Sequence, residues 1–142
     1  SNLKDYQGAI ADYSKAIEIA PQYAFVYYNR GNAKFDLKDY QAAIRDYSKA
    51  IEINPQDASA YNSRGNAKDD LGDYQGAIAD YNKAIEIAPQ YAGAYGNRGL
   101  VKHKLGDENG FCTDAKKAVS LGNQGAAQFL NSEGGAWCRN MR

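Results

Sequence analysis

Few side chains in this sequence have the types and spacing that catalysis or metal binding needs. His103 is the only histidine, and no Cys, Asp or Glu stands near it at ligand spacing. The acidic cluster Asp69, Asp70 and Asp73 lacks the alternating spacing and the glycine of a calcium loop. The sequence also has no phosphate-cradling Gly-Lys-Ser/Thr loop, no nucleophile elbow and no general acid paired with a base on one helix face. We therefore predict no catalytic residue, no metal site and no cofactor, and we expect function to come from the surface.

The two cysteines, Cys112 and Cys138, leave two interpretations open. Cys112 occupies a position where isoleucine recurs, which favours a small buried hydrophobic residue. A disulfide is the alternative, provided that the C-terminal tail folds back toward Cys112.

Length and charge are typical of a small single-domain protein. Its 142 residues, of which 44% are apolar, suffice for one continuous core. Seventeen basic residues balance seventeen acidic ones, which argues against nucleic acid as the partner. No apolar run approaches the roughly 20 residues that span a bilayer, and no signal-like segment opens the chain. We expect no membrane insertion and favour the cytoplasm. The chain starts with Ser-Asn halfway through a repeat, so we also expect further repeats upstream.

The elements that carry these side chains recur at a fixed period. The same residues return every 34 positions, as in Leu3, Leu37, Leu71 and Leu105. Residues 24–57 and 58–91 are identical at 23 of 34 positions. A unit this short cannot bury a core by itself, so its copies are expected to stack into a solenoid.

Each unit is predicted to form two amphipathic helices, because its apolar residues fall at helical spacing. The expected ranges are 24–37 and 40–53, 58–71 and 74–87, and 92–105 and 108–121, preceded by a single helix over 3–20. An aspartate that can cap the free N–H groups precedes each second helix, at Asp39, Asp73 and Asp107. A proline follows three of the helices, at Pro21, Pro55 and Pro89.

This pattern resembles the tetratricopeptide repeat over roughly residues 3 to 130. In one unit the family signature consists of Tyr27, Arg30, Gly31, Lys34, Ala43, Tyr47 and Pro55. The resemblance implies an all-α fold, a right-handed superhelical solenoid of antiparallel helix pairs with about three full repeats. We expect one domain over residues 1–142, divided into a half-repeat (3–23), repeats 24–57 and 58–91, a divergent repeat (92–123), a capping helix (124–132) and an irregular tail (133–142).

Two departures from the family pattern predict specific contacts. Arginine replaces the usual leucine at Arg30, Arg64 and Arg98, and an aspartate recurs at Asp46, Asp80 and Asp114. We expect each arginine to pair with the aspartate of its own unit, because a partly buried guanidinium without a carboxylate is costly. The alternative is that the arginines extend along their stems to water. Near the C-terminus, Ala115 replaces the recurrent tyrosine, and Trp137 is expected to fold into the space that it leaves.

The N-terminal half-unit is expected to present an unpaired apolar face. Its residues 3–20 supply a second helix without the first helix that should cover it. Such a patch commonly marks an association surface, so a homodimer through residues 3–20 is the alternative to an outside ligand.

The resemblance places the first helix of each pair on the concave side of the superhelix, which commonly holds a peptide or helix of another protein. We accordingly predict a protein-interaction module or scaffold with a groove lined by the positions that differ most between units. They are Phe25, Tyr28, Asn29, Asn32, Phe35 and Asp36, then Asn62, Ser63, Asn66, Asp69 and Asp70, then Asn97, Leu100, His103 and Lys104. Aromatic residues would anchor the ligand and asparagines would bond its backbone.

The charges of this groove indicate what it is expected to bind. Some members of the family clamp acidic C-termini with Lys and Asn, but of the corresponding slots here only Asn32 fits. Asp36, Asp69 and Asp70 instead favour a ligand that carries Lys or Arg. His103 and Lys104 stand at the other end, so a ligand with a polarity of charge is expected.

Overall fold

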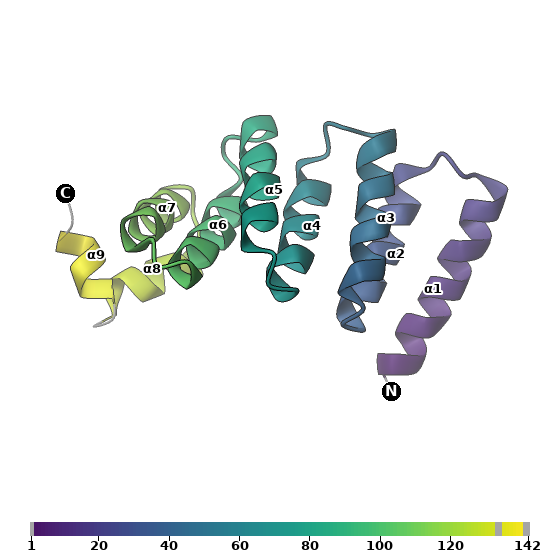
Figure 1. Ribbon diagram of the computed structural model, residues 1–142, viewed down its shortest axis with the longest axis horizontal. Coiled ribbons are helices and arrows are strands. Elements are labelled where there is room, and N and C mark those ends of the chain that lie inside the picture. The colour runs from purple at the N-terminus through teal and green to yellow at the C-terminus, as the bar shows by residue number, and fades with distance from the viewer. Residues whose placement is uncertain (1, 133–134, 141–142) are drawn as a thin grey trace.

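The computed structural model describes residues 2–132 and 135–140, and within these ranges the chain is entirely helical (Figure 1). The helices are α1 (Asn2–Ile19), α2 (Ala24–Asp36), α3 (Tyr40–Ile53), α4 (Ala58–Asp70), α5 (Tyr74–Ile87), α6 (Ala92–Lys104), α7 (Glu108–Ser120), α8 (Gln124–Asn131) and α9 (Ala136–Asn140). They follow one another along an elongated array with the two termini at opposite ends. The chain is thus the solenoid of antiparallel helix pairs that the sequence predicted. None of the described helices is both long enough and apolar enough to cross a membrane.

Side chains and backbone geometry at the turns explain where the helices begin and end. Asp39, Asp73 and Asp107 each accept a hydrogen bond from the backbone N–H three residues further on, at 3.3, 3.0 and 2.9 Å, which confirms the predicted caps. The turns before these caps need a positive φ, which Gly72 and Gly106 adopt at 85° and 83°. Lys38 adopts a φ of 64° in the same slot, a conformation that costs a residue with a Cβ more than it costs glycine.

Within each pair, the two helices approach closely at glycine. A Cβ added to Gly65 would lie 2.7 Å from the ring of Tyr81, and one added to Gly31 would lie 2.8 Å from the ring of Tyr47. Both tyrosines are almost completely buried. The helices of these two pairs therefore approach closely, and a tyrosine ring fills the space above Gly31 and above Gly65.

The arginines pair with the aspartates of their own units, as predicted. Arg64 donates to both carboxylate oxygens of Asp80, from Nε at 2.8 Å and from Nη2 at 2.7 Å, and Lys68 Nζ lies 3.0 Å from the same carboxylate. Arg30 with Asp46 and Arg98 with Asp114 repeat this geometry. The hydrogen bond to the aspartate raises the pKa of each arginine. The aspartates are only 2–4% exposed, so the pairs compensate charges that the fold buries.

The arginines also contact the preceding unit. Nη1 of Arg64 donates to Ser48 Oγ of α3 at 3.1 Å, and Nη1 of Arg30 donates to Ser14 Oγ of α1 at 3.2 Å. Nη1 of Arg98 reaches Asn82 Oδ1 at 2.9 Å. One guanidinium therefore connects the second helices of two successive units.

The C-terminal tail differs from the irregular segment that the sequence predicted. Residues 136–140 form α9, whereas residues 133, 134, 141 and 142 lie outside the described part of the chain. Cys138 of α9 forms a disulfide with Cys112 of α7, and both side chains are fully buried. The preferred interpretation of Cys112 as an unpaired hydrophobic residue was therefore wrong, because the tail does fold back and the bond fixes a helix that has no repeat partner.

Two apolar side chains of the N-terminal helix α1 are more exposed than their counterparts in α3. Its Tyr13 is half-buried, whereas Tyr47 is 1% exposed in the same slot of α3. Leu3 and Ile19 are 55% and 86% exposed. Part of the apolar surface that other units bury is thus open on α1.

Candidate functional site

The groove residues predicted from the sequence lie on the first helices of three successive units, α2, α4 and α6. Contacts between neighbouring first helices recur at a sequence separation of 35. The Tyr28 and Ser63 hydroxyls lie 3.3 Å apart, and the Asn97 amide donates to Asn62 Oδ1 at 3.2 Å. Four of the predicted groove residues thus contact one another along the wall, where they also help to set the spacing of the units.

A small hollow lies where the first two full units meet. It has a volume of about 170 Å³, and we call it the polar hollow. Its lining consists of Asn32, Phe35, Tyr47, Ser63 and Asn66. Phe35 packs edge-on against Tyr40, with ring centroids 5.2 Å apart, so this residue serves packing as well as the hollow.

Two asparagines of the predicted groove are engaged by buried tyrosines. The Tyr47 hydroxyl donates to Asn32 Oδ1 and the Tyr81 hydroxyl donates to Asn66 Oδ1, each at 2.6 Å. Burial raises the pKa of both tyrosines well above the ordinary value, so the phenols remain protonated donors. The asparagine carbonyls are therefore occupied, and the amide N–H groups are what these side chains have left for a ligand.

The charged residues of the groove also interact with each other. Lys104 Nζ donates to Asp69 Oδ1 at 2.7 Å, and this bond raises the pKa of Lys104. His103 Nδ1 lies 2.8 Å from Glu108. Asp69 and Lys104 were expected to attract opposite charges of a ligand, but they neutralise each other. Asp36 and Asp70 remain as exposed carboxylates. At the start of α2, Phe25 is exposed and Asn29 is half-buried.

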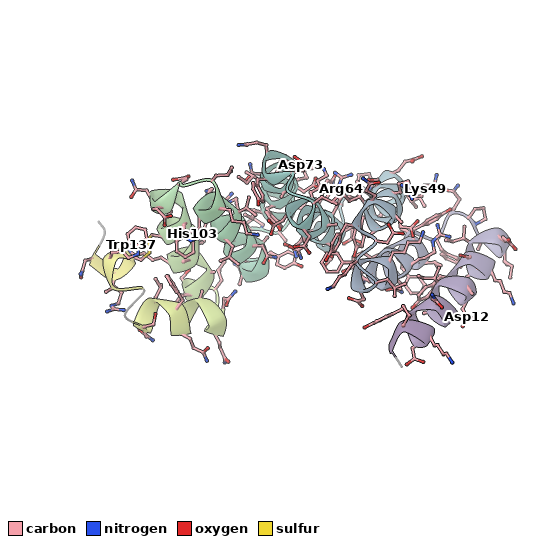
Figure 2. All side chains as sticks on the ribbon, turned by 60° about the horizontal axis from the view of Figure 1, so that its bottom comes forward. Asp12, Lys49, Arg64, Asp73, His103 and Trp137 are labelled. Atoms are coloured by element: carbon pink, nitrogen blue, oxygen red, sulfur yellow. A yellow bond between two sulfur atoms is a disulfide. The ribbon has the colours of Figure 1, made fainter. Side chains whose placement is uncertain are left out.

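A much larger hollow, which we call the C-terminal pocket, lies at the far end of the same wall. Its volume is about 800 Å³, within the range of pockets that hold small molecules or peptide side chains. It is lined by Gly93, Gly96, Asn97, Leu100 and His103 of α6, Glu108, Phe111 and Ala115 of α7, Asn123, Gly125, Ala126 and Phe129 in and next to α8, and Trp137 of α9. His103 and Trp137 can be located at this end of the array in Figure 2.

Sequence reasoning found only the α6 wall of this pocket. It predicted Asn97, Leu100 and His103, but it missed the walls that α7, α8 and α9 contribute. Trp137 was expected to fill the space left by Ala115. Instead both residues line the pocket, and Trp137 is 43% exposed. Two replacements in the sequence could have indicated this pocket. Ala115 stands where the earlier units have a tyrosine, and Leu100 stands where they have an asparagine.

Acidic, histidine and cysteine side chains do not gather into a metal-binding group anywhere in the described ranges 2–132 and 135–140. The Asp69, Asp70 and Asp73 cluster is broken up by the Lys104 contact and by the role of Asp73 as a helix cap.

Sequence models of one repeat family match the chain. A tetratricopeptide repeat model matches residues 24–57, a TPR repeat model matches residues 3–37 and 70–106, and a further tetratricopeptide repeat model matches residues 47–79. The chain belongs to the tetratricopeptide repeat family. No curated protein matches its sequence significantly.

Solved structures of such proteins share the fold. The crystal structure of MamA superposes with a TM-score of 0.84 at 24% identity, over 96% of this chain and 84% of MamA. The TPR domain of Arabidopsis OM64 gives a TM-score of 0.71 at 26% identity, over 82% of this chain and 91% of that domain. The first TPR of Spaghetti (RPAP3), bound to the HSP90 peptide SRMEEVD, gives 0.70 at 26% identity, over 78% of this chain and 95% of that domain.

Proposed function

We propose that this chain is a non-catalytic interaction module that holds a peptide or a helix of a partner protein against α2, α4 and α6. The observation that supports this most directly is the contrast between two sets of positions. Packing positions such as Gly31 and Tyr47 return unchanged in the next unit. Most positions on the inner wall change, as from Tyr28 to Asn62 and from Phe35 to Asp69. A wall that only held the array together would have no reason to vary in this way.

The shape of the wall supports the same conclusion. It contains the polar hollow at one end and the C-terminal pocket at the other, joined by α4. Phe25, which is 65% exposed near the start of α2, offers anchoring area. The RPAP3 domain, which shares this fold, holds a peptide.

The chemistry of the wall favours a different peptide from the one in that structure. SRMEEVD carries three acidic side chains, whereas the wall of this chain presents the exposed carboxylates of Asp36 and Asp70. Like charges at an interface oppose binding, so an acidic C-terminus is disfavoured. We propose a ligand with Lys or Arg toward the α2–α4 end of the wall.

An array of randomised short peptides, followed by fluorescence anisotropy with the hits, tests this function. The variant Phe25→Ala/Tyr28→Ala should bind the hits about tenfold more weakly or worse, because truncating an aromatic anchor costs roughly 1–2 kcal/mol or more. Lys49→Ala on α3 is the matched control, since Lys49 lines neither hollow. The function is refuted if no peptide binds, or if both variants bind as the wild type does.

The open face of α1 supports a second candidate function, which is self-association through residues 3–20. Ile19 is exposed and Tyr13 is half-buried, whereas the same slots of α3 are half-buried and buried. Exposed Leu3 adds apolar surface on the same helix. Light scattering over a range of concentrations distinguishes the two candidates. Self-association predicts a mass that rises with concentration and falls back in Leu3→Lys, whereas a constant monomer mass argues against it.

A further inference from the structure

The C-terminal pocket borders the slot of a side chain that the two preceding units possess. Tyr47 and Tyr81 fill the space between the helices of their pairs, and the same slot in α7 holds Ala115. Each of the two tyrosines donates to an asparagine at 2.6 Å, and the asparagine slot in α6 holds Leu100. Both members of the hydrogen-bonded pair are thus replaced together by apolar residues, so the vacated space has no orphaned polar group.

Neighbouring side chains on α6 are reduced as well, which opens this space toward the groove. Gly96 stands where α2 has Tyr28 and α4 has Asn62, and Gly93 stands where α2 has Phe25. Gly93, Gly96 and Leu100 are spaced by three and four residues and therefore lie on one face of α6. Gly93, Gly96 and Ala115 all line the pocket, so its α6 wall is built from the slots that carry inner-wall side chains in α2 and α4.

The remaining walls of the pocket are rich in aromatic rings. Phe111 lies 5.3 Å from Phe129 and 5.1 Å from His103 between ring centroids, and Trp137 closes the side formed by α9. These separations are those of offset and edge-to-face ring pairs, which a further ring can extend. Phe111 covers Gly99, with Cδ1 3.6 Å from the position of an added Cβ, so the hollow is a side pocket of the groove and does not reach the helix backbone there.

We propose that the C-terminal pocket receives an aromatic side chain of the partner peptide, next to the slot in which α7 lacks a tyrosine. This inference rests on the proposed function, because it takes a peptide in the groove as the source of the ring. The disulfide between Cys112 and Cys138 holds the α9 wall in position. Asn97 and Asn123 at the lining offer polar groups to the hydroxyl or the backbone next to the ring.

A tyrosine side-chain analogue and a rebuilt tyrosine pair test the proposal. The probe is p-cresol, and the signal is the emission of Trp137, which is the only tryptophan and lines the pocket. We expect saturable binding by the wild type, roughly tenfold tighter than binding of cyclohexanol, at the upper end of what ring contacts contribute. The variant Leu100→Asn/Ala115→Tyr returns both residue types of the earlier units. Because Phe111 already covers Gly99, the new ring should enter the pocket, and p-cresol binding should disappear.

Circular dichroism will show whether the double variant folds. If it does not fold, a second variant tests the proposal. Gly96→Asn restores the side chain that α4 carries in this slot. The atom nearest to the added Cβ is Asn123 Nδ2 at 3.2 Å, and Asn123 Oδ1 caps α8 by accepting from Ala126 N at 3.0 Å, so the helix content of this variant is checked in the same way. This variant should weaken p-cresol binding about tenfold if the ring enters the pocket beside Gly96.

The peptide hits of the array distinguish this proposal from the proposed function. We expect them to be enriched in Tyr, Trp or Phe and to lose about tenfold in affinity for Leu100→Asn/Ala115→Tyr. Peptides that bind this variant and the wild type equally overturn the pocket proposal and leave the interaction module intact. Binding of p-cresol without any peptide binding overturns both, and assigns the pocket to a free aromatic compound. Failure of the wild type to bind p-cresol also overturns the pocket proposal.

Discussion

The buried carboxylate of Asp80 offers the sharpest test of what holds the units together. The variant Asp80→Asn keeps the size of the side chain but removes the charge that faces Arg64 at 2.7 and 2.8 Å and Lys68 at 3.0 Å. Two cations then share a site without an anion. Breaking a buried ion pair from one side costs about 3–5 kcal/mol, and we expect the lower end because the Arg64 side chain is still 19% exposed.

A loss of about 3 kcal/mol is a large part of the 5–15 kcal/mol that stabilises a typical domain. The measurement is urea unfolding followed by circular dichroism, because it reports on the whole array, whereas Trp137 reports on one end. Repeat arrays can unfold in parts, so the unfolding curves should be compared in slope as well as in midpoint.

Asp12→Asn provides the matched control. Asp12 has the same slot in α1 as Asp80 has in α5, but it is exposed, and Figure 2 shows it near the N-terminal end. Its replacement should change the free energy of unfolding by no more than about 0.5 kcal/mol. If Asp80→Asn costs as little as Asp12→Asn, the arginine clusters do not stabilise the array and our reasoning is wrong.

Three further predictions concern packing, the disulfide and pH. In urea unfolding, Gly65→Ala should destabilise the protein by about 1–3 kcal/mol, because the new Cβ would lie 2.7 Å from the Tyr81 ring. Gly8→Ala should stabilise the protein by up to about 1 kcal/mol, because nothing lies within 4 Å of the new Cβ. Reduction of the Cys112–Cys138 bond, which spans a sequence separation of 26, should lower the stability of the C-terminal end by about 3–4 kcal/mol; an unchanged melting curve with reductant would contradict this. Raising the pH above 10, the ordinary pKa of tyrosine, should lower the free energy of unfolding, since Tyr81 ionises when unfolded but burial raises its pKa in the folded state. The slope for this residue is about 1.4 kcal/mol per pH unit. Tyr81→Phe should remove that share and leave the share of Tyr47, whose pKa burial also raises.

The sequence predicted those features that depend on comparing one unit with the next. Asp73 as a cap and Asp80 as the partner of Arg64 both follow from a period of 34 residues, because the same contact must form in every copy. The helix α9 and its disulfide could not be predicted with confidence in the same way, since Cys138 lies in a tail without a repeat partner.

The candidate site was predicted less completely, for two physical reasons. Contacts such as Lys104 with Asp69 depend on how far one unit is rotated against the next, and a periodic sequence does not specify this rotation. The C-terminal pocket depends on an absent side chain, and the loss of a tyrosine at Ala115 does not reveal whether other residues close the space. Phe111 covers part of it, and the rest stays open.

The double contact of each arginine has a consequence for how such arrays change in length. Arg30 lies 16 residues after its serine and 16 before its aspartate, and the same steps recur at Arg64. Because all three groups shift together by one period, an internal duplication or excision of 34 residues would join each guanidinium to an equivalent carboxylate and to a Ser or Asn oxygen of the preceding second helix. Evolution can therefore lengthen or shorten this protein by whole units without leaving a buried charge unpaired at the junction.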